Sequence, residues 1–129
     1  MTARTHLTST FLRNTIEIAV QDIVFFQSSH KYVDAYMADG TSHILDDSKL
    51  NTVKALLDEY GDQFMMVHRS CLVRRSEIKS MRRVDNEFTL VLKSDVRVLV
   101  SRRHAPAVRK VVNDYREELK ESVQNEQVY

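Results

Sequence analysis

The sequence predicts a mainly β fold of short antiparallel strands with two helices. Apolar residues alternate or run in short blocks through most of the chain, and turn residues separate these blocks at intervals typical of strands. Only two segments change to the helical period. With 129 residues, of which 43% are hydrophobic, the chain has the size of one domain with a single core.

The first half of the chain predicts three strands and a hairpin. Residues 15–20 and 23–27 form two of the strands, and the Phe25-Phe26 pair suits a sheet that is covered on both faces. Apolar and polar residues alternate over residues 32–37. The Asp39-Gly40 pair that follows predicts a hairpin turn, because an Asp-Gly pair accepts a positive φ.

The second half of the chain predicts three more strands, joined by two hairpins. The strands cover residues 78–84, 88–93 and 96–100, where apolar residues recur with period two. Turn-forming residues at 84–87 and 93–96 lie between them. The strands therefore follow one another as antiparallel neighbours.

The first predicted helix covers about residues 48–60. Ser48 suits its N-cap, and Gly61 lies where a left-handed residue ends a helix. Its apolar face has helical spacing and comprises Val53, Leu56, Leu57 and Tyr60.

The second predicted helix covers about residues 104–121. Pro106 falls in its first turn, where the missing N–H costs little. We take residues 1–129 as one domain, with a core over about residues 4–112 and a C-terminal helix and frayed tail over 113–129. The apolar stripe of this helix comprises Val108, Val111, Val112, Tyr115 and Leu119.

Composition and motifs argue against several classes of protein. The longest apolar runs are too short to cross a bilayer, and the N-terminus does not resemble a secretory signal. A lone cysteine, Cys71, fits a reducing compartment and so the cytoplasm. The five histidines have no paired spacing that predicts a metal site. No phosphate loop, nucleophile elbow or dinucleotide motif is present, so we expect neither enzymatic activity nor a cofactor.

Charge is nearly balanced over the whole chain but strongly segregated along it. Residues 68–110 hold twelve basic and four acidic residues, a net charge of about +8, and the remainder is about −7. Charge runs are more often solvated surface than binding sites. Here, however, several arginines border strands or helices, where a scaffold holds loops in place. This distribution favours nucleic acid as the ligand.

Four motifs in this order and spacing resemble the LytTR family, the DNA-binding output domains of bacterial two-component response regulators. The resemblance covers about residues 4–112. It rests on Asp22-Ile23-Val24-Phe25-Phe26 leading to His30-Lys31-Tyr32-Val33, on Phe64 through Val67-His68-Arg69-Ser70, on Leu72-Val73, and on Val100-Ser101-Arg102-Arg103-His104.

The resemblance implies a LytTR-like β-sandwich, in which short antiparallel strands form layered sheets with two flanking helices. It also implies that this fold binds double-stranded promoter DNA sequence-specifically, as the output module of a transcriptional regulator. It implies loops that enter successive major grooves on one side of bent DNA. It also implies direct-repeat sites that are commonly bound by two copies, and hence a homodimer on DNA.

Residue roles follow from the same resemblance. Base contacts fall on the loop at His30 and Lys31, on Arg69 and on Arg103. An Arg fork can bond both O6 and N7 of guanine, which a Lys does less specifically. Phosphate contacts, which fix register without reading sequence, are assigned to Arg74, Arg75, Arg102, Arg109 and Lys110.

Three residues near these positions have structural interpretations. His68 is predicted to be a hydrogen-bonded histidine that positions the Arg69 loop, rather than a catalytic group, and Ser101 supports the second loop in the same way. Cys71 is predicted to be a small buried hydrophobe. A redox sensor would instead require an exposed thiol, whose pKa the adjacent arginines would lower.

The chain departs from the family pattern at two positions, which leaves a rival function open. Met66 stands where many members carry Arg, and Arg74 stands where many carry Asn. Arg74 either replaces some of the lost positive charge or is a surface residue. The rival is a protein-interaction module on the same fold without base-specific DNA binding. Met65, Met66 and the acidic C-terminal helix would be its partner surface, whereas core filling is the simpler interpretation of the Met pair.

No acidic receiver domain precedes the predicted strands, and the chain is too short to include one. Either the chain is a fragment of a longer regulator, whose other part holds a receiver or sensor domain, or it is a free-standing DNA-binding protein.

Overall fold

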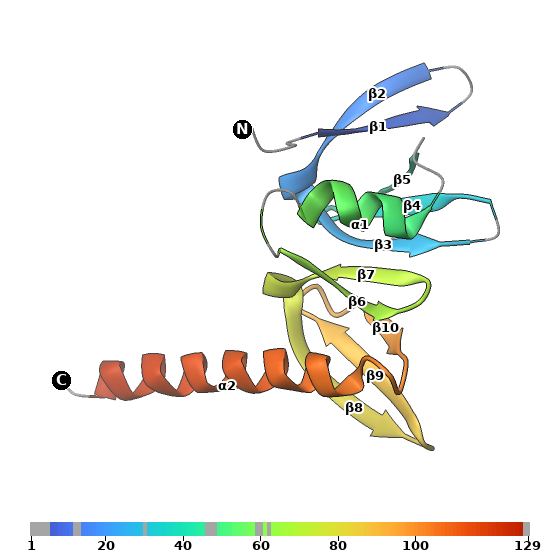
Figure 1. Ribbon diagram of the computed structural model, residues 1–129. Coiled ribbons are helices and arrows are strands. Elements are labelled where there is room, and N and C mark those ends of the chain that lie inside the picture. Colours follow the sequence, from blue (N-terminus) through green and yellow to red (C-terminus); the bar gives the residue numbers. More distant parts are fainter. Residues whose placement is uncertain are drawn as a thin grey trace. The chain divides into compact units, whose positions relative to one another are not determined.

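The computed structural model (Figure 1) describes residues 6–11, 14–29, 31–45, 49–58, 61 and 63–127. The predicted fold class is confirmed, because the described chain consists mainly of antiparallel strands with two helices. The chain divides into two compact units, Met1–Glu77 and Ile78–Tyr129. Each unit has its own sheet and its own helix.

The N-terminal unit contains a seven-stranded antiparallel sheet with the order β2-β1-β5-β4-β3-β7-β6. The 3-10 turn Val20–Asp22 separates β2 from β3 and ends the predicted strand 15–20 one residue early. The strands are β1 (His6–Phe11), β2 (Asn14–Ala19), β3 (Ile23–Ser28), β4 (Val33–Met37), β5 (Ser42–Leu45), β6 (Phe64–His68) and β7 (Cys71–Arg74).

Strand β1 was not predicted, because a buried polar residue hides its alternation. Ser9 points inward with Leu7 and is only 2% exposed. Its hydroxyl donates a hydrogen bond to the carbonyl of Ile44 at 2.5 Å, which satisfies the buried group. A strand that buries a serine in place of an apolar residue does not display the binary pattern of a half-buried strand.

The predicted hairpin between β4 and β5 is present, but its loop has three residues, Ala38, Asp39 and Gly40, rather than the two that the Asp-Gly pair predicted, since Tyr36 stands opposite Ser42. Gly40 has a φ of +90°, and the Met37 amide donates to the Thr41 carbonyl at 2.8 Å. Among the three loop residues, only the glycine takes a positive φ. The turn therefore depends on Gly40 for its backbone geometry.

Helix α1 (Leu50–Asp58) contributes the helical part of the core in the N-terminal unit. Leu50, Val53 and Leu57 are buried, and α1 contacts β3, β6 and β7. The predicted N-cap Ser48 and the predicted face residue Tyr60 lie outside the described residues. Gly61, predicted to end the helix, has a φ of +120° and donates its N–H to the Asp58 carbonyl at 3.4 Å.

The C-terminal unit contains a three-stranded antiparallel sheet with the order β10-β9-β8. Its strands are β8 (Ile78–Val84), β9 (Glu87–Leu92) and β10 (Arg97–Val100). Asp85 and Asn86, in the first hairpin, have φ angles of 50° and 69°, and Asp95, in the second, has 67°. Both predicted hairpins are confirmed, and short polar side chains occupy their left-handed positions.

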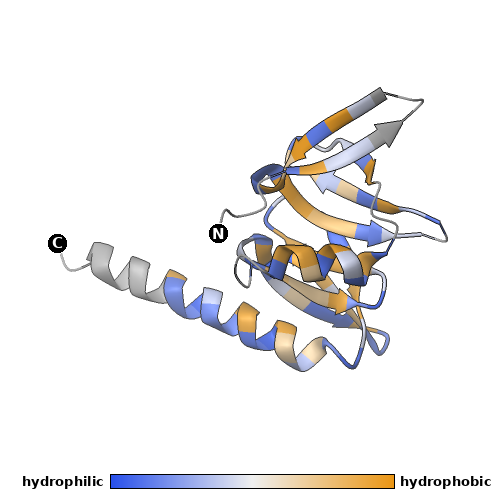
Figure 2. Ribbon diagram, turned by 45° about the horizontal axis from the view of Figure 1, so that its top comes forward, coloured by the Kyte–Doolittle hydropathy of each residue, from blue (hydrophilic) through white to orange (hydrophobic). Residues whose placement is uncertain are grey.

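Helix α2 (Ala105–Gln127) packs against β8. Ala105, Val108 and Val112 are buried, whereas Leu119 is 47% exposed. Polar and apolar residues alternate along α1 and the first turns of α2, and the described residues further along α2 are mostly hydrophilic (Figure 2). The helix continues past the predicted end at about residue 121, so the predicted frayed tail is largely helical.

Candidate nucleic-acid interface

The predicted base-contacting residues lie in three turns. Lys31 lies in the β3–β4 turn and Arg69 in the β6–β7 turn, both in the N-terminal unit, and Arg103 lies in the β10–α2 turn of the C-terminal unit. Lys31, Arg69 and Arg103 are all exposed. His30 lies outside the described residues.

The two turns of the N-terminal unit lie side by side because β3 pairs with β7, with Gln27 opposite Cys71. The Ser28 amide donates to the Ser70 carbonyl at 2.8 Å, and the Gln27 side chain donates to the Ser70 hydroxyl at 3.3 Å. Both turns lie at the same end of the sheet (Figure 1). The structure thus brings Lys31 and Arg69 to one edge of this unit.

The β3–β4 turn also presents an aromatic residue. Tyr32 is 51% exposed, and its carbonyl accepts a hydrogen bond from the Ser29 amide at 2.9 Å, which closes the turn around Lys31. Our sequence interpretation gave Tyr32 no role of its own. The sequence did hold one indication of such a role. Tyr32 directly follows Lys31 at the start of the predicted strand, where an outward-facing aromatic ring would lie beside the lysine.

His68 holds the β6–β7 turn. Its Nδ1 accepts a hydrogen bond from the Ser70 amide at 3.2 Å and lies 2.8 Å from the Ser70 hydroxyl. A ring nitrogen that accepts from an amide carries no proton, so the ring proton of a neutral His68 is on Nε2. The ring therefore joins the two residues on either side of the exposed Arg69.

Ser101 and His104 form a similar arrangement in the β10–α2 turn. The Ser101 carbonyl accepts the amide protons of His104 and Ala105, each at 3.0 Å, and its hydroxyl lies 2.6 Å from Nδ1 of His104. Arg102 and Arg103 are exposed between them. In both loops, a serine–histidine pair therefore brackets the arginines.

Four exposed cations gather where α2 begins. Arg102 and Arg103 lie in the turn, and Arg109 and Lys110 lie on the first turns of the helix. The Arg109 guanidinium carbon is 5.9 Å from the centre of the Phe88 ring. The amides of His104, Ala105 and Val108 at this end of α2 are already bonded to the Ser101 and His104 carbonyls, so a phosphate would be attracted by the four side chains rather than by the helix end.

Arg74 has several partners within the N-terminal unit. Its Nε donates to the Ile23 carbonyl at 2.8 Å, Nη1 donates to the Gln63 side chain at 3.3 Å, and Nη2 donates to the Val20 carbonyl. The guanidinium carbon lies 4.6 Å from the Phe64 ring centre. Burial lowers the pKa of Arg74, and the charges of Glu77 and Asp22 oppose that effect.

These contacts give the half-buried Arg74 a structural role that the sequence did not predict, while its phosphate contact stays a prediction. Its donors serve backbone carbonyls at the 3-10 turn and at β3, so the guanidinium fastens β7 to the start of β3. Arg75, another predicted phosphate contact, is half-buried in the 3-10 turn Arg75–Glu77.

Other cations of the basic segment also have local partners. Arg83 donates to the Asn86 side chain at 3.0 Å, Lys79 pairs with Asp95 at 3.7 Å, and Lys93 lies 4.6 Å from the Tyr115 ring centre. The positive charge of the segment is therefore only partly available to a ligand.

Cys71 is 2% exposed, and burial raises the pKa of its thiol to about 12. The prediction of a small buried hydrophobe is confirmed. A thiol that is shielded and protonated at neutral pH does not suit a redox sensor.

The two methionines of the rival interpretation belong to the interior. Met65 is 5% exposed, and Met66 is partly buried against the core of the N-terminal unit. Core filling, the simpler interpretation, is confirmed. An exposed methionine surface is therefore absent at these two positions.

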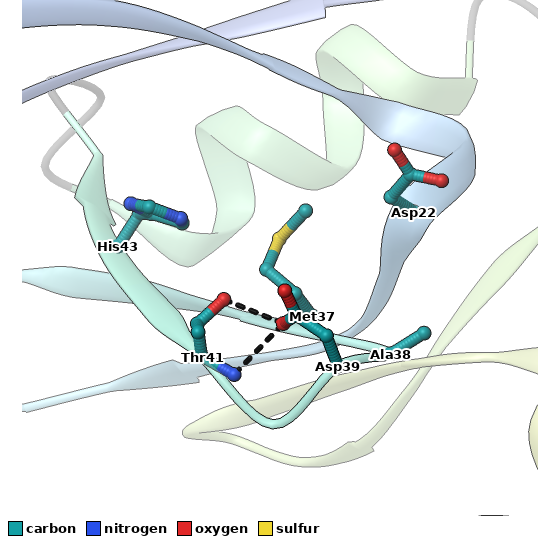
Figure 3. A pocket seen from close by; sticks show the side chains of 6 residues that line it. All are labelled: Asp22, Met37, Ala38, Asp39, Thr41 and His43. Carbon is teal, nitrogen blue, oxygen red and sulfur yellow. Dashed lines mark hydrogen bonds between the residues drawn. The ribbon is translucent and has the colours of Figure 1, made fainter.

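A cavity of about 220 Å³ lies at the other end of β4 from Lys31 (Figure 3). Asp39 accepts hydrogen bonds there from the Thr41 amide at 2.9 Å and hydroxyl at 2.6 Å, and the hydroxyl bond is the main cause of its lowered pKa. Because two carboxylates line it, the cavity does not suit a phosphate. Its lining consists of Asp22, Met37, Ala38, Asp39, Thr41 and His43.

Among the described residues, no group of three or more His, Cys, Asp or Glu side chains could hold a metal ion. In the same part of the chain, no helix is both long and apolar enough to cross a membrane.

Comparisons with known proteins show the family to which the chain belongs. The family model of the LytTr DNA-binding domain matches residues 13–113. The positive alginate biosynthesis regulatory protein of Pseudomonas aeruginosa is 34% identical over 113 residues, which are 85% of this chain and 44% of that protein. The chain thus spans less than half the length of that relative.

A solved structure has the same fold. It is the LytTr DNA-binding domain of a protein described as a methyl-accepting/DNA response regulator from Bacillus cereus. It superposes with a TM-score of 0.70 at 22% identity, over 85% of this chain and 98% of the other. From the family match and the similarity to the alginate regulator, the chain belongs to the LytTR family of DNA-binding domains.

Proposed function

We propose that this chain is the sequence-specific DNA-binding output domain of a bacterial transcriptional regulator and reads bases in the major groove of double-stranded promoter DNA. Membership of the LytTR family supports DNA as the ligand. The observation that carries the proposal is the pair of adjoining turns in the N-terminal unit. There, exposed Lys31 and Arg69 stand on loops that the Ser28–Ser70 backbone hydrogen bond joins.

Arg69 and Arg103 are the proposed guanine readers. Each side chain is exposed on a short turn, so its fork can reach O6 and N7 of a guanine together. The serine–histidine pairs beside them restrict the backbone of both turns, which lowers the entropy lost on binding. His68 and Ser101 are thus proposed as positioning residues.

Lys31 and His30 are proposed to contact bases from the β3–β4 turn. We add Tyr32 to this group, because a half-exposed ring beside Lys31 can pack against a thymine methyl or donate its hydroxyl to the backbone of DNA. A Tyr32→Phe substitution would separate these two contributions.

The proposed phosphate contacts are Arg102, Arg109 and Lys110, which are exposed around the start of α2, together with Arg75. Arg74 is left out because its donors are engaged within the N-terminal unit. Phosphate contacts supply the salt-dependent part of the affinity and set the register of the loops.

The wider biological role is proposed from the relatives. We propose that the domain acts in the cytoplasm and bends direct-repeat sites that two copies occupy. We further propose that it serves a regulator whose receiver or sensor domain lies elsewhere. The matched relative is a regulatory protein more than twice as long as the matched region, which leaves room for such a domain.

Selection from a pool of random duplexes would test the proposal directly. The selected duplex and a scrambled control would then be titrated by fluorescence anisotropy at several salt concentrations. We expect a recovered direct repeat, bound at least about a thousandfold more tightly than the scramble. Equal, salt-sensitive binding to both duplexes would mean that the turns carry charge without base readout, and the interaction-module function would then replace this one.

A further inference from the structure

The β8–β9 hairpin of the C-terminal unit places a second arginine beside the ring that Arg109 of α2 contacts. Arg83 of β8 stands opposite Phe88 of β9 in the strand register. Its guanidinium carbon lies 5.7 Å from the centre of the Phe88 ring, and that of Arg109 lies 5.9 Å from the same centre. We call Arg83 and Arg109 the arginine pair. One ring therefore stands beside two guanidinium groups, one from the sheet and one from the helix.

The arginine pair lacks a neutralising partner within the part of the chain that the structure describes. Neither arginine forms an ion pair there. Arg83 donates one hydrogen bond, to the uncharged side chain of Asn86 at 3.0 Å, and a guanidinium has five N–H donors. Both ring distances are close to the limit of about 6 Å for a cation–π contact, so Phe88 holds the two groups only weakly. Two like charges around one ring repel each other, and an anion bound by both would remove this repulsion.

The acidic residues of the hairpin do not supply that anion. Glu87 directly precedes Phe88 in β9, so its side chain lies on the opposite face of the sheet. Asp85 lies in the hairpin turn and, among the described residues, forms no ion pair with Arg83. The hairpin therefore leaves the charge of the arginine pair in place.

The helix surface around Arg109 adds positive rather than negative charge. Arg116, seven residues along, lies on the same side of α2 two turns away. Asp114, five residues along, lies on another side of the helix. The positions three and four residues from Arg109 hold uncharged residues, which are Ala105, Pro106, Val112 and Asn113. Within one turn of Arg109 on its own side, the helix therefore offers no carboxylate to compete with a bound anion.

The arginine pair lies at the end of the sheet that carries the β10–α2 turn. Phe88 stands opposite Val100, the last residue of β10, and the turn that follows holds exposed Arg102 and Arg103. The register therefore puts the arginine pair and the proposed guanine reader Arg103 at one end of the C-terminal unit. A DNA strand bound at Arg103 would pass close to the pair.

We propose that the β8–β9 hairpin is a further DNA-binding element, in which the arginine pair binds phosphates of one DNA strand next to the guanine that Arg103 reads. Guanidinium groups bind phosphate oxygens through two parallel hydrogen bonds, which suits this ligand. Phe88 is a positioning residue, because its ring keeps both guanidinium groups in one place without neutralising them. The contact sets register and carries no base information. The inference rests on the proposed function, to which it adds Arg83.

Arg83→Gln tests this element in titrations of the full chain with the selected duplex and the scramble. Both duplexes should bind about three- to tenfold more weakly than with the wild type, because a phosphate contact is lost and base readout is kept. The slope of log K against log salt should fall by about 1. Arg83→Lys should keep the slope and lose part of the affinity, because lysine retains the charge without the fork.

Arg82→Gln is the matched control, since it removes the same charge from the neighbouring position of the same strand. Arg82 stands opposite Thr89, so it lies on the other face of the sheet from Phe88. Its affinity and slope should both match those of the wild type. Circular dichroism and urea denaturation should show that all three variants keep the wild-type fold.

A neutral methylphosphonate linkage, placed at one phosphate of the selected duplex at a time, would identify the partner of Arg83. At the phosphate that Arg83 contacts, the linkage should weaken binding by the wild type and have little further effect on Arg83→Gln. Arg82→Gln should respond to that linkage as the wild type does.

Three outcomes would overturn the inference. If Arg83→Gln binds a recovered site with wild-type affinity and slope, the hairpin is not part of the DNA surface, and the proposed function stands. Equal losses with Arg82→Gln would mean that the hairpin acts only through its total charge. Linkages that weaken the wild type and Arg83→Gln by the same factor at every phosphate would exclude a direct contact.

One further outcome separates this inference from the proposed function. A wild-type chain that binds both duplexes equally, with a salt slope that Arg83→Gln reduces, would support the hairpin contact and contradict the base readout.

Discussion

Arg103 and Arg109 lie near the same end of α2, but their substitution should affect DNA binding in different ways. Arg103→Ala should reduce the binding free energy for the selected duplex by roughly 1–3 kcal/mol and relax the preference at one base position, because it removes the proposed bidentate contact with guanine. Arg109→Ala should weaken every duplex by about the same factor. Anisotropy titrations of the selected site and its single-base variants would measure both, and a uniform loss with Arg103→Ala would rule out base reading by that residue.

Arg74 should matter for stability rather than for DNA binding. Arg74→Ala leaves the carbonyls of Ile23 and Val20 without their donor, so we expect a loss of about 2 kcal/mol in the free energy of unfolding. Urea denaturation would measure this loss. The slope of log K against log salt for DNA binding should be the same for the folded variant as for the wild type. A shallower slope for the variant would mean that Arg74 contacts a phosphate after all.

Cys71 should make the fold sensitive to alkali. Its pKa is raised by burial to about 12 from an ordinary value of 9.0, so only the unfolded chain ionises readily between these values. The stabilising effect of the protonated thiol is complete below pH 9 and is lost as pH rises toward 12. Cys71→Ala should flatten the fall in unfolding free energy over this range, measured by urea denaturation at successive pH values.

At the scale of elements, the β6–β7 turn owes its shape to a small hydrogen-bonded network. Ser70→Ala removes the hydroxyl that contacts both His68 and Gln27. We expect binding to the selected duplex to weaken about three- to tenfold, and binding to the scramble to stay unchanged, because the Arg69 turn loses order but no charge.

A double-mutant cycle with His68→Gln would test whether the histidine and the serine act together in this turn. Coupling between the two substitutions is expected, since both belong to one network. Strictly additive effects would mean that His68 does not position Arg69 through Ser70.

The elements differ in how well the sequence predicts them. Both hairpins of the C-terminal unit were predicted because Asp85, Asn86 and Asp95 stand where left-handed residues are needed. Strand β1 was missed because Ser9 occupies an inward position, and its partner carbonyl, Ile44, is distant in sequence. The end of α2 was placed too early, because a mostly polar sequence gives no apolar periodicity to follow.

The candidate site was predictable only in part, for a related physical reason. Exposed turn residues such as Arg69 and Arg103 follow from motif and spacing. The structural role of Arg74 could not be predicted in this way, because it depends on the carbonyls of Val20 and Ile23, which come near β7 only in the folded sheet. The sequence alone gave no reason to assign a role to Tyr32, and its exposure in the Lys31 turn did so only in the folded structure.

For the whole molecule, salt should report how many phosphates the domain contacts. If Arg75, Arg102, Arg109 and Lys110 each neutralise one, removing any of them should reduce the slope of log K against log salt by about 1. Titrations with the scrambled duplex from about 50 to 200 mM salt would measure the slopes. A variant that loses affinity but keeps its slope would be acting through the fold instead.

The hydrogen bond between Ser28 and Ser70 has a consequence for how binding sites diverge. The two N-terminal turns that we propose to read bases share this bond, while the Arg103 turn belongs to the other unit. Base changes opposite Lys31 and Arg69 should therefore have energies that do not simply add, and a change opposite Arg103 should add independently. If these turns read bases as proposed, the promoters that the domain recognises would vary independently at the position opposite Arg103 and would covary at the two positions opposite Lys31 and Arg69.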